Sequence, residues 1–206
     1  MEQNKYSIRK EKLDEILSIA EEFKVKKVVH EKIAEKPRFI NVESIHVILN
    51  NKKFLTREII LKNEGYGSAA VMLPITKDND VLLTIEPRVA TKRTVGISFP
   101  AGYIEEGELP QVAAVRELYE ETGYAASEVI PLASYYQDAG CSRAYNHAFL
   151  MKGCEKVGDQ HLDEFEYIKY VTCKYEEALY LMEAGYIEDC NAIIALEKSK
   201  KYMKEL

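Results

Sequence analysis

A helical segment at residues 110–122 constrains this chain more than any other part of its sequence. Pro110 is tolerated in the first turn of a helix. Gly123 is well placed to end the helix, because glycine readily adopts the left-handed conformation that follows a last turn. At about 100° per residue, three acidic side chains fall on one side of this helix: Glu117, Glu120 and Glu121. The opposite side, with Val115, Leu118 and Tyr119, is predicted to pack on a sheet.

The acidic side of this helix favours a compensating cation. Like charges three and four positions apart repel by a few tenths of a kcal/mol per exposed pair. Arg116 supplies one positive charge, four positions before Glu120. The remaining carboxylates suit a hard divalent cation, which can neutralise phosphoryl oxygens and activate water. The alternative is a solvated helix face paired with Arg116, and the charges alone do not decide between the two.

Composition excludes several classes of protein. The net charge of -6 and the pI near 5.4 argue against a generally basic nucleic-acid binder. The N-terminal segment lacks the apolar core of a signal peptide, and no run approaches the ~20 apolar residues that span a bilayer. The cysteines show no paired spacing, so we expect reduced thiols in a cytoplasmic protein; they are Cys141, Cys154, Cys173 and Cys190.

The length of 206 residues fits one domain with an appendage. Apolar residues at helical spacing predict an amphipathic helix from residue 5 to about 35, within an N-terminal extension that we place at 1–40. Residues 41–206 form the predicted main domain. Its first part, with β-branched runs at 42–49 and 54–61, is typical of a hairpin.

Further strands and helices alternate through the main domain. Strands are predicted at 68–75, 81–86, 128–136, 145–151 and 166–173. The C-terminal segment 175–202 returns to helical periodicity, with Gly185 separating two helices. This alternation around one central helix predicts an α/β fold in which helices cover a mixed sheet.

The residues around the acidic helix resemble the Nudix box in every fixed position: Gly102, Glu108, Arg116, Glu117, Glu120, Glu121 and Gly123 at the box spacing. One soft departure is Tyr124, which is aromatic where the box usually has an aliphatic residue. The resemblance implies an α/β/α sandwich and a metal-dependent hydrolase. The segments flanking the box are most similar to those of ADP-ribose pyrophosphatases, over about residues 42 to 203.

The resemblance also implies roles for these residues. Glu117, Glu120 and Glu121, with the carbonyl of Ala101, are the implied ligands of Mg²⁺ or Mn²⁺, and Glu120 is also counted among the catalytic residues. Glu108 and Arg116 are implied to hold the loop to the helix, with Gly123 ending it. Gly102 and Gly107 are expected to permit the tight loop, and Gly102 also to border the substrate.

The flanking segments suggest further functional residues. Arg88 matches an arginine that reaches substrate phosphates, and Arg93 is a second candidate in the same loop; the alternative is a surface arginine at a strand end. Glu166 matches the residue usually assigned as general base, with Glu164 as its neighbour. Here the alternative is an ordinary solvated acidic loop.

ADP-ribose is the substrate that the resemblance implies, with AMP and ribose 5-phosphate as products. Ala139 stands where the subfamily typically carries a proline, so the loop over the substrate can differ in shape. The alternatives are another diphosphate, such as a nucleotide sugar, a dinucleoside polyphosphate or an oxidised nucleotide, and a noncatalytic module that senses ADP-ribose. By analogy with the subfamily, the hairpin at 43–61 is expected to form a homodimer.

Overall fold

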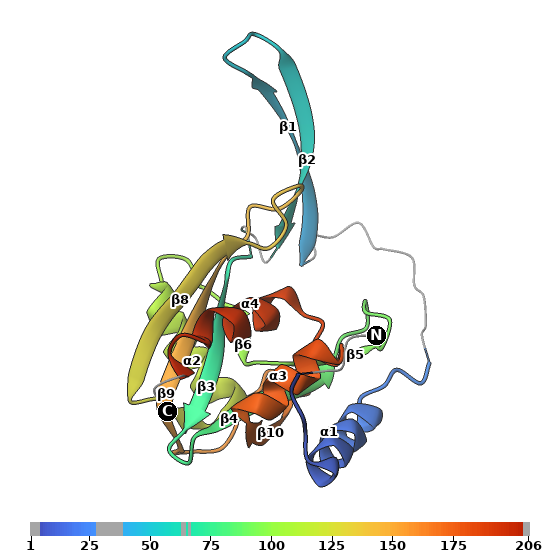
Figure 1. The fold of residues 1–206 in the computed structure, drawn as a ribbon. Helices are drawn as coiled ribbons and strands as arrows, with labels where there is room; N and C mark the ends of the chain where they lie inside the picture. Colours follow the sequence, from blue (N-terminus) through green and yellow to red (C-terminus); the bar gives the residue numbers. More distant parts are fainter. Residues whose placement is uncertain (1–4, 28–38, 63–64, 66, 204–206) are drawn as a thin grey trace.

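The computed structural model describes residues 5–27, 39–62, 65 and 67–203 (Figure 1). The elements, in chain order, are α1 (Lys10–Glu22), β1 (Ile40–Ile48), β2 (Phe54–Lys62), β3 (Ala69–Thr76), β4 (Asp80–Pro87), β5 (Val95–Ser98), β6 (Ala101–Tyr103), α2 (Pro110–Thr122), β7 (Tyr124–Ala125), β8 (Glu128–Tyr136), β9 (Tyr145–Lys156), β10 (Lys169–Lys174), α3 (Tyr175–Glu183) and α4 (Cys190–Ser199). Each helix in these described segments is too short or too polar to cross a lipid bilayer.

The main sheet is mixed, as predicted. Its central order is β10-β4-β3-β9-β7, with β5 added to β4, β6 to β3 and β8 to β9. Strands β3 and β9 run parallel, and the other pairs in this sheet are antiparallel. The parallel pair sits at the centre: β3 is almost wholly buried, and β9 is buried at Asn146, Ala148–Met151 and Cys154.

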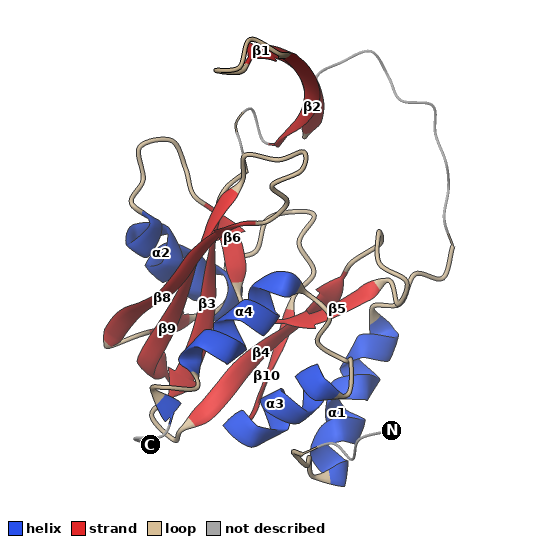
Figure 2. Cartoon of the chain, turned by 45° about the horizontal axis from the view of Figure 1, so that its top comes forward, coloured by secondary structure: helices blue, strands red, loops and turns tan. Residues whose placement is uncertain are grey.

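Helices cover both faces of the sheet (Figure 2). Side chains alternate along β3: Ala70 and Met72 pack towards α2, whereas Val71 and Leu73 face the other layer. That second layer is made by α1, α3 and α4, whose buried residues belong to the same cluster. The predicted α/β/α sandwich is therefore confirmed.

Helix α1 is shorter than predicted. It ends at Glu22, residues 23–27 are not helical, and residues 28–35 of the predicted helix lie outside the described residues. Lys24, Lys26 and Lys27 interrupt the apolar spacing of the predicted helix, in agreement with its early end. The helix packs on the body through Ile16, which is fully buried, and through the two hydrogen bonds of the Arg9 guanidinium to Glu177.

Strands β1 and β2 form the predicted hairpin, which extends away from the main sheet (Figure 1). Its turn places Lys52 at a φ of 66°. The base of the hairpin contacts the loop after β8, where the Ile60 N–H donates to the Cys141 carbonyl over 2.7 Å. The rest of the hairpin exposes large apolar side chains, among them Phe54 at 84%.

Most other predicted elements appear, with three additions. Strands β5, β6 and β7 were not predicted, because each has four residues or fewer and is held by pairing with a distant strand. Strand β10 begins at Lys169, later than the predicted residue 166. The cysteines are free, as expected.

Candidate active site

Helix α2 carries the acidic face and has the predicted bounds. Gly123 follows it with a φ of 71°, and the Gly123 N–H donates to the Tyr119 carbonyl. The side that packs on the sheet consists of small or apolar residues, Ala113, Ala114 and Leu118. The prediction that Val115 and Tyr119 pack there is wrong: they are 46% and 37% exposed. The alanines bring the helix close to the sheet and rotate those two side chains to its edge.

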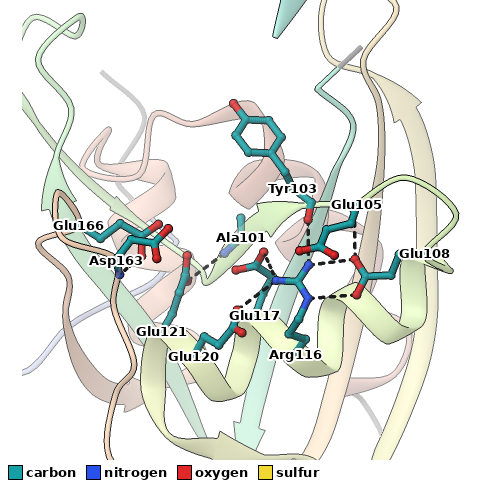
Figure 3. A network of polar contacts seen from close by, with 10 residues as sticks. All are labelled: Ala101, Tyr103, Glu105, Glu108, Arg116, Glu117, Glu120, Glu121, Asp163 and Glu166. Atoms are coloured by element: carbon teal, nitrogen blue, oxygen red, sulfur yellow. Dashed lines mark hydrogen bonds and ion pairs between the residues drawn. The ribbon is translucent and has the colours of Figure 1, made fainter. Parts of the chain in front are cut away.

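Arg116 joins the helix to the preceding loop (Figure 3). It donates from Nε and Nη2 to the two Glu108 oxygens, over 3.0 and 2.9 Å, and from Nη2 to the Tyr103 carbonyl over 3.0 Å. The hydrogen bonds from Arg116 lower the pKa of the Glu108 carboxyl. Arg116 also donates from Nη1 to Glu117 over 2.7 Å and to Glu120 over 3.0 Å. One guanidinium thus orients the loop and two of the three acidic side chains.

Glu121 is the most buried of the three acidic residues, at 6% exposure. Its Oε2 accepts from the Ala101 N–H over 3.1 Å, which fixes it beside strand β6. Burial, followed by the negative charges of Glu86 and Glu117, raises the pKa of Glu121 well above its usual value. Burial likewise raises the pKa of Glu117, although Arg116 opposes the shift. The carboxylates of Glu86, Glu117 and Glu121 therefore lie close together, and the positive charge of Arg116 does not fully balance them.

Gly102 leaves room for Glu117. A Cβ built on Gly102 would lie 1.9 Å from the Cδ of Glu117, a separation that no pair of carbon atoms tolerates. The Gly102 backbone pairs with Ala70 of β3, so it cannot move away freely. A side chain at this position would push the flexible end of Glu117 away, so the present place of the carboxylate depends on glycine.

These residues open onto a pocket of 690 Å³. Of the residues that sequence analysis proposed, it is lined by Arg88, Ala101, Gly102, Arg116, Glu117, Glu120, Glu121 and Glu166. Glu166 and Asp163 lie on the loop before β10, on the side of the pocket where Glu121 lies (Figure 3). The Asp163 N–H donates to Glu166 Oε2 over 3.1 Å, and the charge of Glu166 contributes to the raised pKa of Glu121.

Two of the proposed residues lie elsewhere. Arg93 approaches Glu188 at 3.6 Å and lies over the ring of Tyr186, and it is not among the described residues that line the pocket. Glu164 is exposed and is also absent from that lining. Arg88 does line it, with its guanidinium 2.7 Å from Glu86 Oε1. Glu108 and Gly123 are also absent from the lining: Glu108 bonds to Arg116, and Gly123 ends α2.

The pocket also contains residues that sequence reasoning missed, among them Lys62, Glu86, Gln137, Asn146, Asp189 and Asn191. They come from strands β2, β4 and β9, the loop after β8 and the start of α4, so no local spacing marks them. Glu86 had one available signal, because it lies two positions before Arg88 on the same side of the extended chain. Burial raises the pKa of the Glu86 carboxyl.

The residues fit a divalent cation by their chemistry. In the described part of the chain, no three His, Cys, Asp or Glu side chains are gathered closely enough to enclose an ion as they stand. Glu117 and Glu120 instead bond to Arg116. Their carboxylate oxygens, and those of buried Glu121, are nevertheless the hard ligands that Mg²⁺ and Mn²⁺ prefer. A cation would also relieve the repulsion that raises the pKa of Glu117 and Glu121.

The family model of the NUDIX domain matches residues 65–189, which contain the loop, helix α2 and most of the pocket. The chain belongs to the Nudix family. The box residues noted in the sequence are thus part of a Nudix domain, and α1 and the β1–β2 hairpin precede the matched region.

Known proteins share the Nudix domain of this chain. An ADP-ribose pyrophosphatase of Bacillus subtilis is 32% identical over 152 residues, covering 73% of this chain and 80% of that protein. A methanol dehydrogenase activator of Bacillus methanolicus is 29% identical over 161 residues, covering 78% and 84%. The crystal structure of an ADP compounds hydrolase superposes with a TM-score of 0.70 at 23% identity, covering 85% of this chain and 91% of the other. The Nudix fold is common to the two structures.

Proposed function

We propose that this Nudix protein hydrolyses the diphosphate linkage of ADP-ribose and releases AMP and ribose 5-phosphate. The observation that carries the proposal is the meeting of the acidic face of α2 with Arg88 in one pocket. The similarity to an ADP-ribose pyrophosphatase over most of both chains supports the choice of substrate.

Mg²⁺ is the proposed cofactor, with Mn²⁺ as a substitute. The proposed ligands are Glu117, Glu120 and Glu121, with the carbonyl of Ala101. A divalent cation held there supplies positive charge that neutralises the phosphoryl oxygens as the bond to the leaving phosphate breaks. Arg88 contributes a second positive charge for the diphosphate, because its guanidinium lines the same pocket.

Glu166 is the proposed general base. Its carboxylate lies on the acidic side of the pocket, and the N–H of Asp163 holds one of its oxygens. The other oxygen is thereby oriented to take a proton from a water that attacks phosphorus. Glu164 does not line the pocket in this arrangement, so its proposed part is limited to the charge of the loop.

A purified-enzyme assay tests the proposal. We expect turnover of ADP-ribose in Mg²⁺, with AMP and ribose 5-phosphate as products. Glu117→Gln and Glu121→Gln should each lower kcat at least about a hundredfold, or roughly 2.7 kcal/mol of barrier. Glu106→Gln, at an exposed residue of the loop before α2, is the matched control and should stay within about twofold.

Two results would contradict the proposal. Near-normal turnover in both glutamine variants would show that Glu117 and Glu121 are not the metal ligands. Tight binding of ADP-ribose without product in Mg²⁺ would instead favour a sensing module.

A second candidate substrate is another nucleotide sugar. The loop after β8 carries Ala139 instead of the subfamily proline, and the neighbouring Gln137 lines the pocket. A loop of different shape can admit a different sugar. Values of kcat/KM for ADP-ribose, GDP-mannose, UDP-glucose and diadenosine polyphosphates would rank these substrates.

The protein is further proposed to be a homodimer in the cytoplasm. The exposed apolar side chains of the β1–β2 hairpin support self-association, because such surfaces are usually covered. The free cysteines support a reducing compartment.

Residues 1–40 are further proposed to be an extension that is distinct from the Nudix domain of residues 41–206. Removing residues 1–40 and measuring the thermal midpoint of the remaining protein would test this division.

A further inference from the structure

Asn191 lies at the end of a chain of hydrogen bonds that fixes how its side chain meets the pocket. The chain begins at the backbone N–H of Ala69, which donates to Asn146 Oδ1 over 3.0 Å. Asn146 is 1% exposed, and its Nδ2 donates to Asn191 Oδ1 over 3.0 Å. The side chain of Asn191 lies at the pocket wall, in the first turn of α4.

The donor and the acceptor of each hydrogen bond in this series follow from the backbone group at which it begins. A backbone N–H can only donate, so Asn146 must turn its oxygen to Ala69 and its NH₂ to Asn191. Asn191 must then present its oxygen to Asn146. The amide orientation, which is often ambiguous for asparagine, is thus set by a main-chain group.

Tyr135 reinforces this orientation. Its hydroxyl donates to the same Asn191 Oδ1 over 2.9 Å. Burial raises the pKa of Tyr135, so the hydroxyl keeps its proton and remains a donor at neutral pH. Both lone pairs of Asn191 Oδ1 are occupied, and no hydrogen bond from its Nδ2 occurs among the described residues. The NH₂ group is the part of Asn191 left for a ligand.

The surroundings of Asn191 indicate what the ligand group is. Asp189 also lines the pocket, and its Oδ1 caps α4 by accepting from the N–H groups of Asn191 and Ala192. No described residue donates to the other oxygen, Oδ2. The charge of Asp189 acts on Glu86, so Asp189 adds negative charge to this part of the pocket. A hydroxyl both accepts from an amide and donates to a carboxylate, whereas an ionised phosphate only accepts. The edge of an adenine base also does both, and a substrate with a changed base separates the two.

We propose that Asn191 is a specificity-determining residue, whose NH₂ donates to a sugar hydroxyl of the nucleotide substrate while Asp189 accepts from it. This assignment rests on the proposed function, since it places the substrate in the same pocket. The assignment also gives a reason for the buried polar side chain of Asn146. Burying this amide costs free energy of desolvation, and its hydrogen bonds to Ala69 and Asn191 hold Asn191 in place.

Asn191→Asp is the sharpest variant. An aspartate keeps an oxygen for Asn146 and Tyr135 but replaces the NH₂, for which the described residues provide no hydrogen-bond partner. We expect KM for ADP-ribose to rise at least about tenfold, with kcat within about threefold. Asn191→Ala, which adds no charge, should raise KM similarly.

Deoxy analogues identify the group that Asn191 recognises. We compare ADP-ribose analogues that each lack one hydroxyl, at position 2 or 3 of either the adenosine ribose or the terminal ribose. KM is measured for each analogue with the wild type and with Asn191→Ala. We expect one analogue to show a raised KM on wild type and no further increase on the variant. IDP-ribose, in which only the base is changed, should keep the full effect of the variant.

The outcomes separate this inference from the proposed function. If wild type does not hydrolyse ADP-ribose, the proposed function fails first. If wild type is active but Asn191→Asp and Asn191→Ala leave KM unchanged, or the effect disappears only with IDP-ribose, the sugar assignment is overturned while the proposed function stands. A fall in thermal midpoint with unchanged KM would also overturn it, because that result assigns Asn191 a purely structural role.

Discussion

Gly102 faces the carboxylate of Glu117 so closely that a methyl group added to it would lie 1.9 Å from the Glu117 Cδ. The glycine belongs to β6, which pairs with β3, and the glutamate belongs to α2. The sheet and the acidic helix therefore meet at a glycine, and the position of a proposed metal ligand depends on the absence of a side chain there.

Gly102→Ala should accordingly displace Glu117. We expect kcat to fall at least about a hundredfold, as for loss of the carboxylate itself, because the flanking strand pairing prevents the backbone from yielding. The matched control is Gly107→Ala in the loop between β6 and α2. Gly107 has a φ of 79°, but an added methyl group there would meet nothing within 4 Å, so its alanine costs about 1 kcal/mol of strain and should keep activity within about tenfold. Equal activity losses in the two variants would contradict the steric explanation.

Glu121 should make the metal-free protein less stable as pH rises. Its pKa is raised in the folded state, mainly by burial. Its stabilising contribution is therefore full below the unfolded pKa of about 4.3 and is lost as pH rises through the higher folded pKa. The thermal midpoint, measured in EDTA from about pH 4 upward, should fall more steeply for wild type than for Glu121→Gln. Mg²⁺ should restore the midpoint of wild type at neutral pH. Parallel curves for the two proteins would argue against this effect.

Arg9 and Glu177 should protect the fold at neutral pH. Glu177 is 4% exposed, and hydrogen bonds from Arg9 lower its pKa to about 2. The stabilisation is present above the unfolded pKa of about 4.3 and is lost as pH falls towards 2. Arg9→Met should lower the free energy of unfolding in urea at pH 7, and should lower it less at acid pH, where Glu177 is protonated. In a Glu177→Gln background the same change should cost much less, and Lys24→Met, at an exposed pair, should cost little.

Local patterns predicted the helix with the acidic face, because every determinant of α2 lies within its own sequence. Pro110 starts it, Gly123 ends it, and the glutamates share a side by spacing alone. The same local logic overestimated α1 and misjudged the edge residues Val115 and Tyr119, since how deeply a helix face is buried depends on the sheet beneath it.

The part of the pocket that is lined by Asn146 and Asn191 could not be predicted from the sequence, for a related reason. Asn146 lies near the start of β9, and Asn191 is 45 positions later, yet they are joined by a hydrogen bond. Nothing near either residue in the sequence signals the other. Strand β6 is likewise defined by its partner β3, and it is this pairing that brings Ala101 and Gly102 to α2.

The exposed hairpin should hold two copies of the chain together if the proposed dimer forms. Ile48 and Phe54 are paired across β1 and β2 and are 67% and 84% exposed. Burying a side chain of this size stabilises by about 1.5 to 3 kcal/mol, and a two-fold symmetric interface contains each substitution twice. Phe54→Asp should therefore raise the dissociation constant at least about a hundredfold in light scattering after size exclusion. Glu58→Gln, on the same hairpin, should leave it within about threefold. A wild-type monomer at every concentration, or a Phe54→Asp dimer as tight as wild type, would show that this surface serves another purpose.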